Sequence, residues 1–524
     1  MFRRLKLNHS NTKKVLSSQE NVTKETYIEI NEALKENKQM IKETLGDSKD
    51  IFIREIKLHK NNNTQLSAII VGIGGLVDEQ AIRQQVVEPL LSEPLENKND
   101  ILNAVKTRIY VKDIKSENNL YHGILQILKG GTLILIDGCS TGLLIQAEGS
   151  AERAIEEPPT GTVVSGSREG FVEELDTNIA LLRKRIGHPN LRVKSYTLGE
   201  FSQTDIIVAY VDGIVDPKIV ERMHKRIIQI EVDDIASSGQ IEQYLSGNPY
   251  SIFPTTGNTE RPDQLAAMLM EGRVALLTDG TPVALYYPSL FLESLQSVED
   301  YSSKPFYSSF TRLLRFLAFF LSILLPSLYI CAVNIHKDMI PSKFLLALEQ
   351  SREGVPFPLV QETILLLILF EIVREAGIRM PRAIGQAVSI VGALILGEVS
   401  VAAGIISSQT SIVVATASIT TFIVTPVAEV VSLLRFLYII PSAIFGFYGL
   451  MICILLTITH MVNLKSMGVY YLGPIMPVHL KDWKDTLIRL PYNLLKFRPK
   501  SIPNLRPIRY KKVPQTNENK EDEE

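Results

Sequence analysis

The runs LAFFLSILLPSLYICAV at 317–333 and AIGQAVSIVGALILG at 383–397 decide the fold class of this chain of 524 residues. Both belong to a C-terminal region in which uncharged apolar stretches follow one another from about Arg312 to Asn463. A helix needs about 20 apolar residues to cross a bilayer. Several runs near that length cannot share one soluble core without leaving a very large apolar surface. The sequence therefore predicts an α-helical polytopic membrane domain.

The sequence before these runs is more polar and predicts a soluble head. Met1 to Asp50 lacks the apolar core and the small-residue cleavage site of a signal peptide, so we expect the head to stay in the cytoplasm. Cys139, Cys331 and Cys453 are too few and too scattered for a disulfide framework or a thiolate metal site. The formal net charge of −2 gives no basic excess, so we expect no nucleic-acid partner.

An internal repeat divides the head into two similar subdomains. IIVGIGGLVD at 69–78 matches IVAYVDGIVD at 207–216, and GGTLILIDG at 130–138 matches GRVALLTDG at 272–280. Two matches in the same order indicate a duplicated unit of ordinary domain size. The first match predicts a buried strand whose closing Asp caps the next helix. The second places Asp-Gly between apolar runs, which favours a tight hairpin with two positive φ angles. Each unit is therefore α/β.

These features divide the chain into five predicted segments. The helical pattern FVEELDTNIALLRKRIG at 171–187 is expected to begin the second subdomain. The segments are a polar, disordered N-terminal segment (1–55), two cytoplasmic α/β subdomains (56–157 and 158–300), the helical membrane domain (301–465) and a basic cytoplasmic tail with an acidic end (466–524).

The head contains no residue pattern typical of an active site. Gly72, Gly74 and Gly75 follow a predicted strand, but Val77 stands where a dinucleotide-binding loop requires glycine. The His residues are isolated, without the HExxH spacing of a metal site. The sequence has no Gly-x-Ser-x-Gly motif, no Walker-type loop and no paired catalytic carboxylates. We therefore expect no enzymatic activity, no cofactor and no bound metal.

Charge sets the predicted topology, because Lys and Arg accumulate in short cytoplasmic loops. With the head inside, 313–333 exits, 359–373 returns and 383–406 exits again. The C-terminal tail is rich in Lys and Arg and therefore lies inside, which requires an even number of spans. We count four spans, the last at 430–461, plus one re-entrant or broken segment at 407–426. Six spans are the alternative.

Ionisable side chains inside apolar runs face a protein interior or an aqueous path. Glu398, Val401, Ile405 and Ser408 share one helical stripe beside small residues that permit close helix contact, and an assembly of such helices would line a pore. Alternatively, the small residues only pack helices and Glu398 pairs with an arginine such as Arg435. Hydroxyls in such helices also commonly bond their own backbone. The remaining pore-lining candidates are Thr410, Thr416 and Thr420, and the remaining intramembrane charge candidates are Glu362, Glu371 and Glu429.

Several segments resemble the GerA family of spore germination receptors, specifically its A subunit. They run in order over most of the chain after about residue 160, whereas the segment before about residue 60 shows no such match. The resembling stretches include FVEELDTNIALLRKRI (171–186), FPTTGNTERPD (253–263), EGRVALLTDGTP (271–282), REGVPFP (352–358) and EIVREAGIRMPRAIGQAVSIVGALILGEVSVAAGIIS (371–407).

The resemblance implies the A subunit of a nutrient-responsive germinant receptor in the inner membrane of an endospore, with head and tail on the core side. In this family the A subunit acts with a transporter-like, nutrient-binding B subunit and a lipoprotein C subunit. A subunits of the family are expected to assemble among membrane lipids as pentamers, forming a channel that releases cations. Two alternatives stay open: a non-conducting scaffold that couples the nutrient-binding subunit to downstream effectors, and a transporter, which should carry repeat symmetry in its membrane half.

Overall fold

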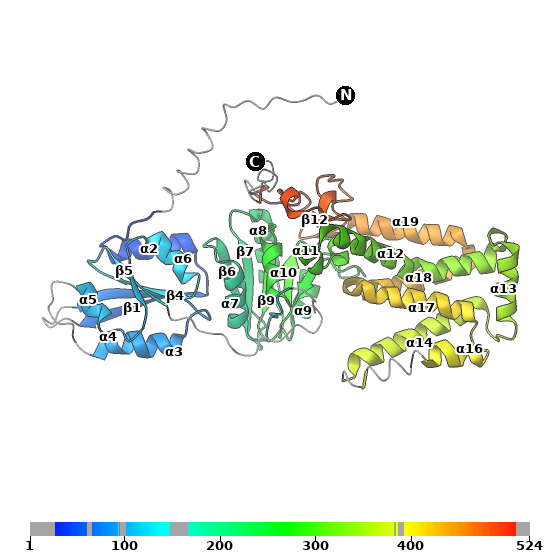
Figure 1. The fold of residues 1–524 in the computed structure, drawn as a ribbon, viewed down its shortest axis with the longest axis horizontal. Coiled ribbons are helices and arrows are strands. Elements are labelled where there is room, and N and C mark those ends of the chain that lie inside the picture. Colours follow the sequence, from blue (N-terminus) through cyan, green and yellow to red (C-terminus); the bar gives the residue numbers. More distant parts are fainter. Residues whose placement is uncertain are drawn as a thin grey trace, which may run out of the picture. The chain divides into compact units, whose positions relative to one another are not determined.

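The computed structural model divides the chain into two compact units (Figure 1). The first unit is an α/β structure, and the second is built mainly from helices. The first comprises Met1–Thr162, Ser167–Leu245 and Asn258–Tyr287, and the second comprises Val163–Gly166, Ser246–Gly257 and Pro288–Glu524. The described residues are 27–59, 65–92, 94, 101–146, 166–381, 384, 385, 392 and 394–509. The predicted boundary between the subdomains, at 157 and 158, lies outside them.

The first unit contains two five-stranded sheets with the same strand order. The order is β1-β2-β4-β5-β3 in one sheet and β6-β7-β9-β10-β8 in the other, which agrees with the internal repeat. All pairings in the first sheet are antiparallel. The strands are β1 (Ile51–His59), β2 (Gln65–Ile73), β3 (Ile114–Glu117), β4 (Gly131–Ile136), β5 (Gly142–Gln146), β6 (Leu191–Leu198), β7 (Thr204–Val211), β8 (Gly257–Thr259), β9 (Val274–Thr278) and β10 (Ala284–Tyr287).

Helices cover both faces of the first sheet, because its central strands carry apolar side chains on both sides. Ile69 and Val71 of β2 pack in one cluster with Ile41, whereas Ile70 packs in another cluster with Val86. The helices of the first unit are α2 (Leu34–Leu45), α3 (Glu79–Ile82), α4 (Glu88–Ser92), α5 (Ile101–Lys106), α6 (Leu120–Ile127), α7 (Leu175–Arg185), α8 (Pro217–Ile228), α9 (Ser238–Leu245) and α10 (Pro262–Leu269).

Helix α2 corrects the predicted N-terminal segment. Residues 1–55 are predicted to be disordered, but the structure forms α2 and the start of β1 within them. The buried Asn37 of α2 accepts a hydrogen bond from the backbone N–H of Asn31 at 2.9 Å, and Asn178 of α7 accepts one from Val172 at 2.8 Å. Helix α2 is thus the counterpart of α7. Its sequence, LKENKQMIKETL, hides this role because only the side chains that face the sheet are apolar.

Asp78 and Asp216 cap the helices that follow β2 and β7, as their spacing predicts. The carboxylate of Asp78 accepts a hydrogen bond from the N–H of Ala81 at 2.9 Å, and that of Asp216 accepts one from Lys218 at 3.0 Å. These N–H groups have no partner within their own helices, so each aspartate stabilises a helix start.

The two Asp-Gly dipeptides lie in equivalent connections between antiparallel strands, β4 to β5 and β9 to β10. Only the glycines have positive φ, 80° at Gly138 and 78° at Gly280, so the prediction of two positive φ angles per turn is wrong. The aspartates have another role. Asp137 accepts a hydrogen bond from the first N–H of α2 at 3.2 Å, and Asp279 accepts one from the first N–H of α7 at 3.3 Å.

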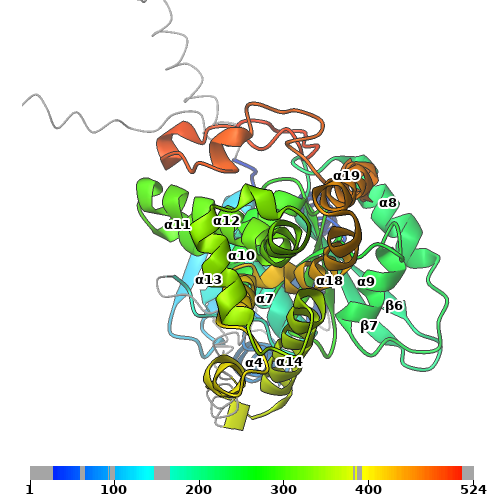
Figure 2. The ribbon, with the colours of Figure 1, turned by 90° about the vertical axis from the view of Figure 1, so that its right-hand side faces the viewer.

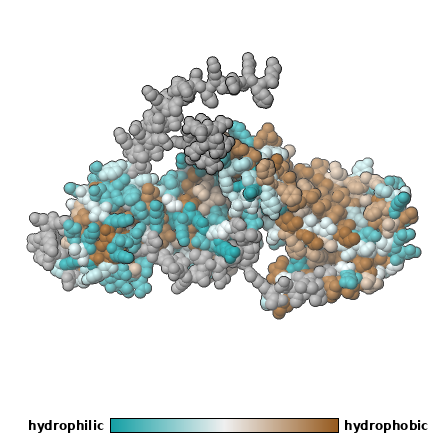
Figure 3. All heavy atoms as spheres, in the orientation of Figure 1, coloured by the Kyte–Doolittle hydropathy of each residue, from teal (hydrophilic) through white to brown (hydrophobic). Residues whose placement is uncertain are grey.

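The second unit is a helical bundle, and hydrophobic side chains cover much of its visible face (Figure 3). Two described segments, Pro305–Ile335 and Thr425–Phe445, are long and apolar enough to cross a membrane, and α17 and α19 are shorter apolar helices. The main helices are α11 (Glu299–Ser302), α12 (Pro305–Ile330) with a π-helical extension η4 (Cys331–Ile335), α13 (Ser342–Arg352), α14 (Leu359–Arg379), η6 (Ile395–Val399), α16 (Ser400–Ala402), α17 (Ser408–Ile423), α18 (Ala428–Phe445) and α19 (Phe447–Asn463).

The long helices run in two opposite directions, and Figure 2 views several of them end-on. We name the end at which α12 begins the proximal end and the end at which η4 finishes the distal end. His336, after η4, lies 4.8 Å from the ring of Phe447, so α18 ends and α19 begins at the distal end. Tyr329, late in α12, is 3.4 Å from the hydroxyl of Thr410, so α17 also begins there.

Helix α14 and the segment after it are antiparallel neighbours. Near the start of α14, Glu362 binds the backbone N–H of Ser407 at 2.6 Å. Further along α14, Val373 lies close to Gly392. A Cβ added to Gly392 would be 2.8 Å from the Val373 side chain. The described residues between Met380 and Ser407 therefore lead back toward the distal end.

The C-terminal apolar stretch differs from its prediction. The single span predicted at 430–461 is two helices, α18 and α19, which separate at Gly446. Gly446 has φ 60° and ψ −139°, a conformation that other residues rarely adopt, whereas Pro441 stays inside α18. The segment 407–426, expected to be broken or re-entrant, forms the continuous helix α17 up to Ile423.

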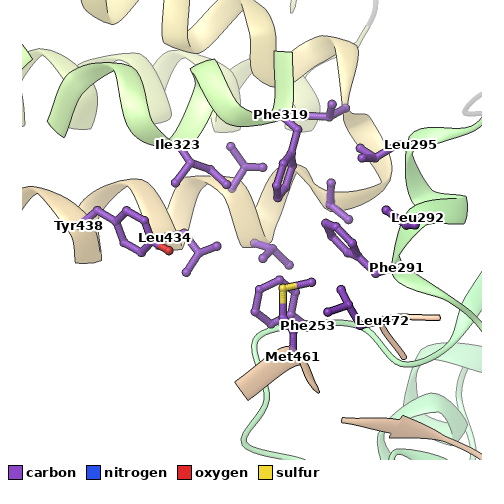
Figure 4. Packing of buried hydrophobic residues seen from close by; sticks show 14 of the residues in the cluster. Phe253, Phe291, Leu292, Leu295, Phe319, Ile323, Leu434, Tyr438, Met461 and Leu472 are labelled. Atoms are coloured by element: carbon purple, nitrogen blue, oxygen red, sulfur yellow. The ribbon is translucent and has the colours of Figure 1, made fainter. Parts of the chain in front are cut away.

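Aromatic side chains form the proximal core of the second unit (Figure 4). The ring of Phe291 lies 5.3 Å from that of Phe319 on α12 and 5.9 Å from that of Tyr471, beyond α19. Phe253, from the loop 246–257, also lies 6.2 Å from Phe291. The core thus joins the base of α12 to the chain that follows the last long helix.

Candidate functional site

Arg435 is a fully buried cation at the centre of the helical bundle. Its Nε donates a hydrogen bond to the carbonyl of Ser322 on α12 at 2.7 Å, and its Nη2 donates to the carbonyl of Ala417 on α17 at 3.0 Å and to the hydroxyl of Thr421. Its nearest carboxylate is Glu371 of α14, 3.9 Å away. One side chain on α18 thus links three other helices.

The carboxylate that pairs with Arg435 in the structure therefore differs from Glu398, the partner suggested by the sequence. The described structure pairs Arg435 with Glu371, so the alternative pairing of Glu398 with Arg435 is wrong. Glu371 also accepts a hydrogen bond from Ser432 at 2.8 Å and pairs with Arg374 at 2.8 Å. The predicted intramembrane charges Glu371 and Arg435 are brought together although 64 positions separate them in sequence (435 − 371).

Glu362 is a second buried charge, and it lies at the distal end. Its carboxylate accepts hydrogen bonds from the N–H of Ser407 at 2.6 Å and from the Ser407 hydroxyl at 2.7 Å. Ser407 is in turn the N-cap of α17, where its hydroxyl accepts a bond from the N–H of Thr410. Arg352 of α13 is 3.7 Å from the other carboxylate oxygen. Glu362 thus ties α13 and α14 to the residue that ends the segment before α17.

Glu398, Val401, Ile405 and Ser408 do not share one helical stripe, so that prediction is wrong. Glu398 lies in η6 and Val401 in α16, the chain turns at Gly404, which has φ 67°, and Ser408 begins α17. Glu398, Ile405 and Ser408 are exposed, and Val401 is half-buried. A Cβ added at Gly397 would meet nothing within 4 Å, so the chain is open beside Glu398. An exposed carboxylate and hydroxyl in an apolar segment need an aqueous path or a second copy beside them.

The threonine candidates do not share that surface. Thr410 is buried, and it contacts Ser407 and Tyr329. Thr416 donates to the carbonyl of Ile412 at 2.8 Å, and Thr420 donates to that of Thr416 at 2.9 Å. The hydroxyls of Thr416 and Thr420 therefore bond to the backbone of their own helix, as the alternative interpretation of the sequence predicted. The remaining charge candidate, Glu429, is exposed in the first turn of α18 at the proximal end, where a carboxylate favours the helix dipole.

A third buried charge network was not identified from the sequence as a site. Arg312, at the start of α12, pairs with Asp300 at 2.8 Å and with Asp485 at 3.1 Å, and Arg315 pairs with Asp300 at 2.9 Å. The sequence marks Arg312 and Arg315 only as charges that flank the first apolar run. Asp485, a partner of Arg312, lies 173 residues away from it in the sequence, so no local pattern reveals that pair.

Metal chemistry has no support in the part of the chain that the structure describes. No group of three or more His, Cys, Asp or Glu side chains there is arranged to hold a metal ion. A cavity of about 460 Å³ lies at the distal end between η4 and α13, with Lys337, Glu349 and Arg352 among its lining residues. The polar groups of the bundle are therefore suited to joining helices and to offering a charged surface.

Comparison with known proteins places these features in a family. The sequence profile described as "Bacillus/Clostridium GerA spore germination protein" matches residues 39–501, which span both units. The chain belongs to this GerA family. The match begins inside α2, so the GerA likeness extends upstream of residue 60, where the sequence alone showed none.

Individual proteins similar to this chain include two from Bacillus subtilis and one solved structure. "Spore germination protein KA" of Bacillus subtilis (strain 168) is 37% identical over 91% of this chain and 88% of its own length. The "Uncharacterized membrane protein YfkQ" of the same organism is 34% identical over 89% of this chain and 90% of its own length. The crystal structure of the N-terminal domain of the A subunit of the Bacillus megaterium spore germinant receptor GerK3 is 32% identical, covers 51% of this chain and 98% of that chain, and has a TM-score of 0.40.

Proposed function

We propose that this GerA-family chain is the A subunit of a nutrient-gated spore germinant receptor and that several copies form an ion-conducting channel. The observation that carries the channel proposal is that Glu398, Ile405 and Ser408, around the turn before α17, are exposed on the single chain. A carboxylate and a hydroxyl are costly in hydrocarbon, so in a membrane Glu398 and Ser408 require water or a neighbouring subunit. A ring of copies that turn these exposed residues inward would meet this requirement and would release cations past the carboxylates.

The proposed membrane topology has six crossings. Helices α12 and α18 run from the proximal to the distal end, and α14, α17 and α19 run back. The segment 383–406 supplies the remaining outward crossing. Six is an even number, so the head and the basic tail lie on the same side, which the positive-inside rule makes the cytoplasmic core of the spore. The inner spore membrane is the proposed location, and the relative named as a membrane protein supports a membrane setting.

The proposed partners follow from the GerA family. The chain would act with a transporter-like B subunit, which binds the nutrient, and with a lipoprotein C subunit, among membrane lipids. Five copies of the A subunit would form the ring. Family membership supports a role in spore germination, and the proposed assembly would connect nutrient binding by the B subunit to opening of the channel.

A non-conducting scaffold is the second candidate function, and one observation favours it. The hydroxyls of Thr416 and Thr420 bond their own helix, and Arg435 is engaged with neighbouring helices, so these groups serve packing. A transporter is less consistent with the fold, because the duplicated architecture lies in the α/β unit.

Cysteine accessibility tests the channel proposal. Glu398→Cys, Ile405→Cys and Ser408→Cys would be made singly in a chain without native cysteines and reconstituted with the B and C subunits. A charged aqueous thiol reagent is expected to react at all three positions when nutrient is present, and to reduce cation flux. The control is Ile412→Cys, which is exposed on α17 beside apolar neighbours and is expected to react slowly.

Two results would contradict the channel. Reaction at these three positions no faster than at Ile412→Cys would show that the three residues do not face water. Nutrient binding without any cation flux, in the complete receptor, would favour the scaffold. Glu398→Gln, run in parallel, is expected to change the preference for cations if the carboxylate ring lines the path.

A further inference from the structure

The chain after α19 folds back onto the base of α12. Residues 464–509 include a two-stranded sheet, β11 (Lys465–Ser466) and β12 (Val469–Tyr470), and short helical turns. Arg489 donates hydrogen bonds to the carbonyls of Ser303 at 3.0 Å and Tyr301 at 3.3 Å. The hydroxyl of Tyr492 also donates to the carbonyl of Tyr301, at 3.0 Å. We call residues 475–509 the tail module, because these contacts hold it as a defined structure.

The exposed charge of the tail module is positive. Its acidic residues are Asp482 and Asp485, and both are engaged inside the unit. Asp482 accepts hydrogen bonds from the backbone N–H groups of Lys500 and Ser501, at 3.0 and 2.8 Å. Asp485 pairs with the buried Arg312. The exposed basic residues of the module are Lys481, Lys496, Lys500, Arg506 and Arg509.

Exposed apolar side chains alternate with these basic residues. Leu480 is 77% exposed beside Lys481, Leu494 is 55% exposed and Leu505 is 59% exposed. A folded segment with this much exposed apolar surface marks an interaction site. Basic residues combined with exposed apolar and aromatic side chains are typical of protein segments that lie in the interface of an anionic membrane. The other exposed apolar and aromatic residues of the module are Ile475, Met476, Val478, Trp483, Ile488, Tyr492, Phe497 and Ile508.

The position of the module favours a membrane over other partners. It contacts the first turns of α12, where Ser309 accepts a hydrogen bond from the N–H of Arg489 at 3.1 Å. On the same turns Phe306, Tyr307 and Phe310 are exposed. Aromatic residues at the end of a spanning helix mark the level of the lipid headgroups. The apolar and basic surface of the module is therefore continuous with the level at which α12 would enter the bilayer.

We propose that the tail module binds the anionic surface of the membrane on the side of the head, with its basic residues at phospholipid phosphates and its apolar residues among the upper acyl chains. This inference rests on the membrane-spanning part of the proposed function. It adds a lipid-binding surface at the base of the first span. The buried pairs of Arg312 with Asp300 and Asp485 connect that surface to α12, so anionic lipid would stabilise the position of α12.

Trp483 provides a native probe, because it is the only tryptophan of the chain and belongs to the tail module. The full chain would be placed in nanodiscs of phosphatidylcholine alone or mixed with phosphatidylglycerol. In the anionic discs we expect an acrylamide quenching constant lower by about twofold or more, quenching by lipids brominated in the upper acyl chain, and reversal of both at 1 M salt, because about 1 M salt screens charges beyond about 3 Å.

Matched charge variants make the test specific. Lys481→Gln/Lys496→Gln/Lys500→Gln is expected to abolish the difference between the two lipid compositions. Lys57→Gln/Lys218→Gln/Lys343→Gln, with the same change of charge at exposed positions elsewhere, is expected to retain it. Equal acrylamide quenching of Trp483 in both kinds of disc at low salt would overturn the inference.

Other occupants give different outcomes, each of which overturns it. If Trp483 is protected equally in both lipids and becomes accessible when residues 513–524 are removed, the acidic end of the chain covers the module. If protection arises only when the partner subunits are added, the module binds protein. Failure of the chain to enter nanodiscs would instead contradict the proposed membrane topology. Disc incorporation is measured before quenching, so this failure is distinguished from failure of the lipid-binding inference.

Discussion

Arg183 and Asp50 form a buried ion pair that joins the two subdomains of the head. Arg183 of α7 donates from Nε to one carboxylate oxygen of Asp50 at 2.6 Å and from Nη2 to the other at 3.2 Å. Both side chains are almost fully buried. Beside them, the N–H of Lys49 donates to the carbonyl of Val193 at 3.1 Å. The duplicated sheets are therefore held together by a charge pair contributed by both copies.

Removing one partner of this pair should loosen the subdomain interface. Asp50→Ala leaves the Arg183 guanidinium buried without a carboxylate, which destabilises a protein by about 3–5 kcal/mol. Hydrogen exchange of peptides from α7 and β6 in the full chain should accelerate accordingly. The double variant Asp50→Leu/Arg183→Met should be less destabilised than Asp50→Ala, because no charge stays buried. Equal acceleration in both variants would assign the effect to lost packing.

A second contact between the subdomains should depend on pH. Lys49 donates a hydrogen bond to Asp205 at 2.7 Å, which lowers the pKa of this carboxyl from its ordinary value of 3.8, and a bond from Thr197 acts in the same direction against partial burial. A lowered pKa means that the pair stabilises the fold above about pH 4, and that this contribution is lost as the pH falls through the lowered pKa.

Lys49→Gln should therefore lower the melting temperature of the full chain in detergent at pH 6, and the difference from the parent protein should shrink below pH 3. Both side chains are more than one-third exposed, so the effect is small and decreases with salt. Lys57→Gln, an exposed change on β1, serves as the control. A difference in melting temperature that stays constant from pH 6 to pH 2.5 would contradict the role of Asp205.

The turn between α18 and α19 should require glycine. At Gly446 a Cβ would lie 2.3 Å from a ring carbon of His336, and the backbone conformation is one that side chains disfavour. Gly446→Ala should lower the melting temperature of the detergent-solubilised chain, since such strain costs about 1–3 kcal/mol. Gly397→Ala is the control, because open space surrounds that residue. Equal melting temperatures for the two variants would argue against the helical hairpin.

The link between Glu371 and Arg435 should couple α14 to the centre of the bundle. Glu371→Gln removes the carboxylate nearest to a buried guanidinium and should lower the melting temperature. In the double variant Glu371→Gln/Arg435→Met, part of the loss should be recovered, with a coupling energy of about 0.5–3 kcal/mol. Glu375→Gln, which alters an exposed pair with Arg379 on the same helix, should have little effect. Strictly additive changes would show that the two residues act independently.

Glu362 should hold the end of the segment that carries Glu398 and Ile405. Glu362→Ala removes the acceptor of both bonds from Ser407, so the start of α17 and the residues before it should become more mobile. Hydrogen exchange of peptides covering 400–412 should increase, and the cation flux of the proposed channel should change. Glu353→Ala, an exposed change nearby, provides the comparison. Normal exchange in Glu362→Ala would mean that packing alone positions Ser407.

The sequence predicted those parts of the fold that depend on local patterns. Apolar runs marked the helical bundle, and the matched stretches at 69–78 and 207–216 marked the duplicated α/β unit. The caps at Asp78 and Asp216 also followed from spacing, because a side chain that caps its own helix is a local interaction. Helix α2 escaped detection because its polar sequence gains stability only when its apolar face meets the sheet.

The candidate site depended more on tertiary structure. The sequence identified Glu362, Glu371 and Arg435 as costly intramembrane charges, since ionisable residues in apolar runs need partners. It could not choose those partners, because Glu371 and Arg435 meet only when α14 packs against α18. The same holds for Arg312 and Asp485, which are brought together by the fold of the tail.

By itself, the sequence determined the class of the protein: a duplicated α/β head, a helical bundle apolar enough for a membrane, and a basic tail. Composition and periodicity suffice for this, because they record which surface each element can bury. Only the tertiary structure decided where the long C-terminal stretch turns, which charges pair and which polar side chains stay exposed. These properties depend on the backbone conformation at Gly446 and on contacts between distant segments, and neither is encoded in a local pattern.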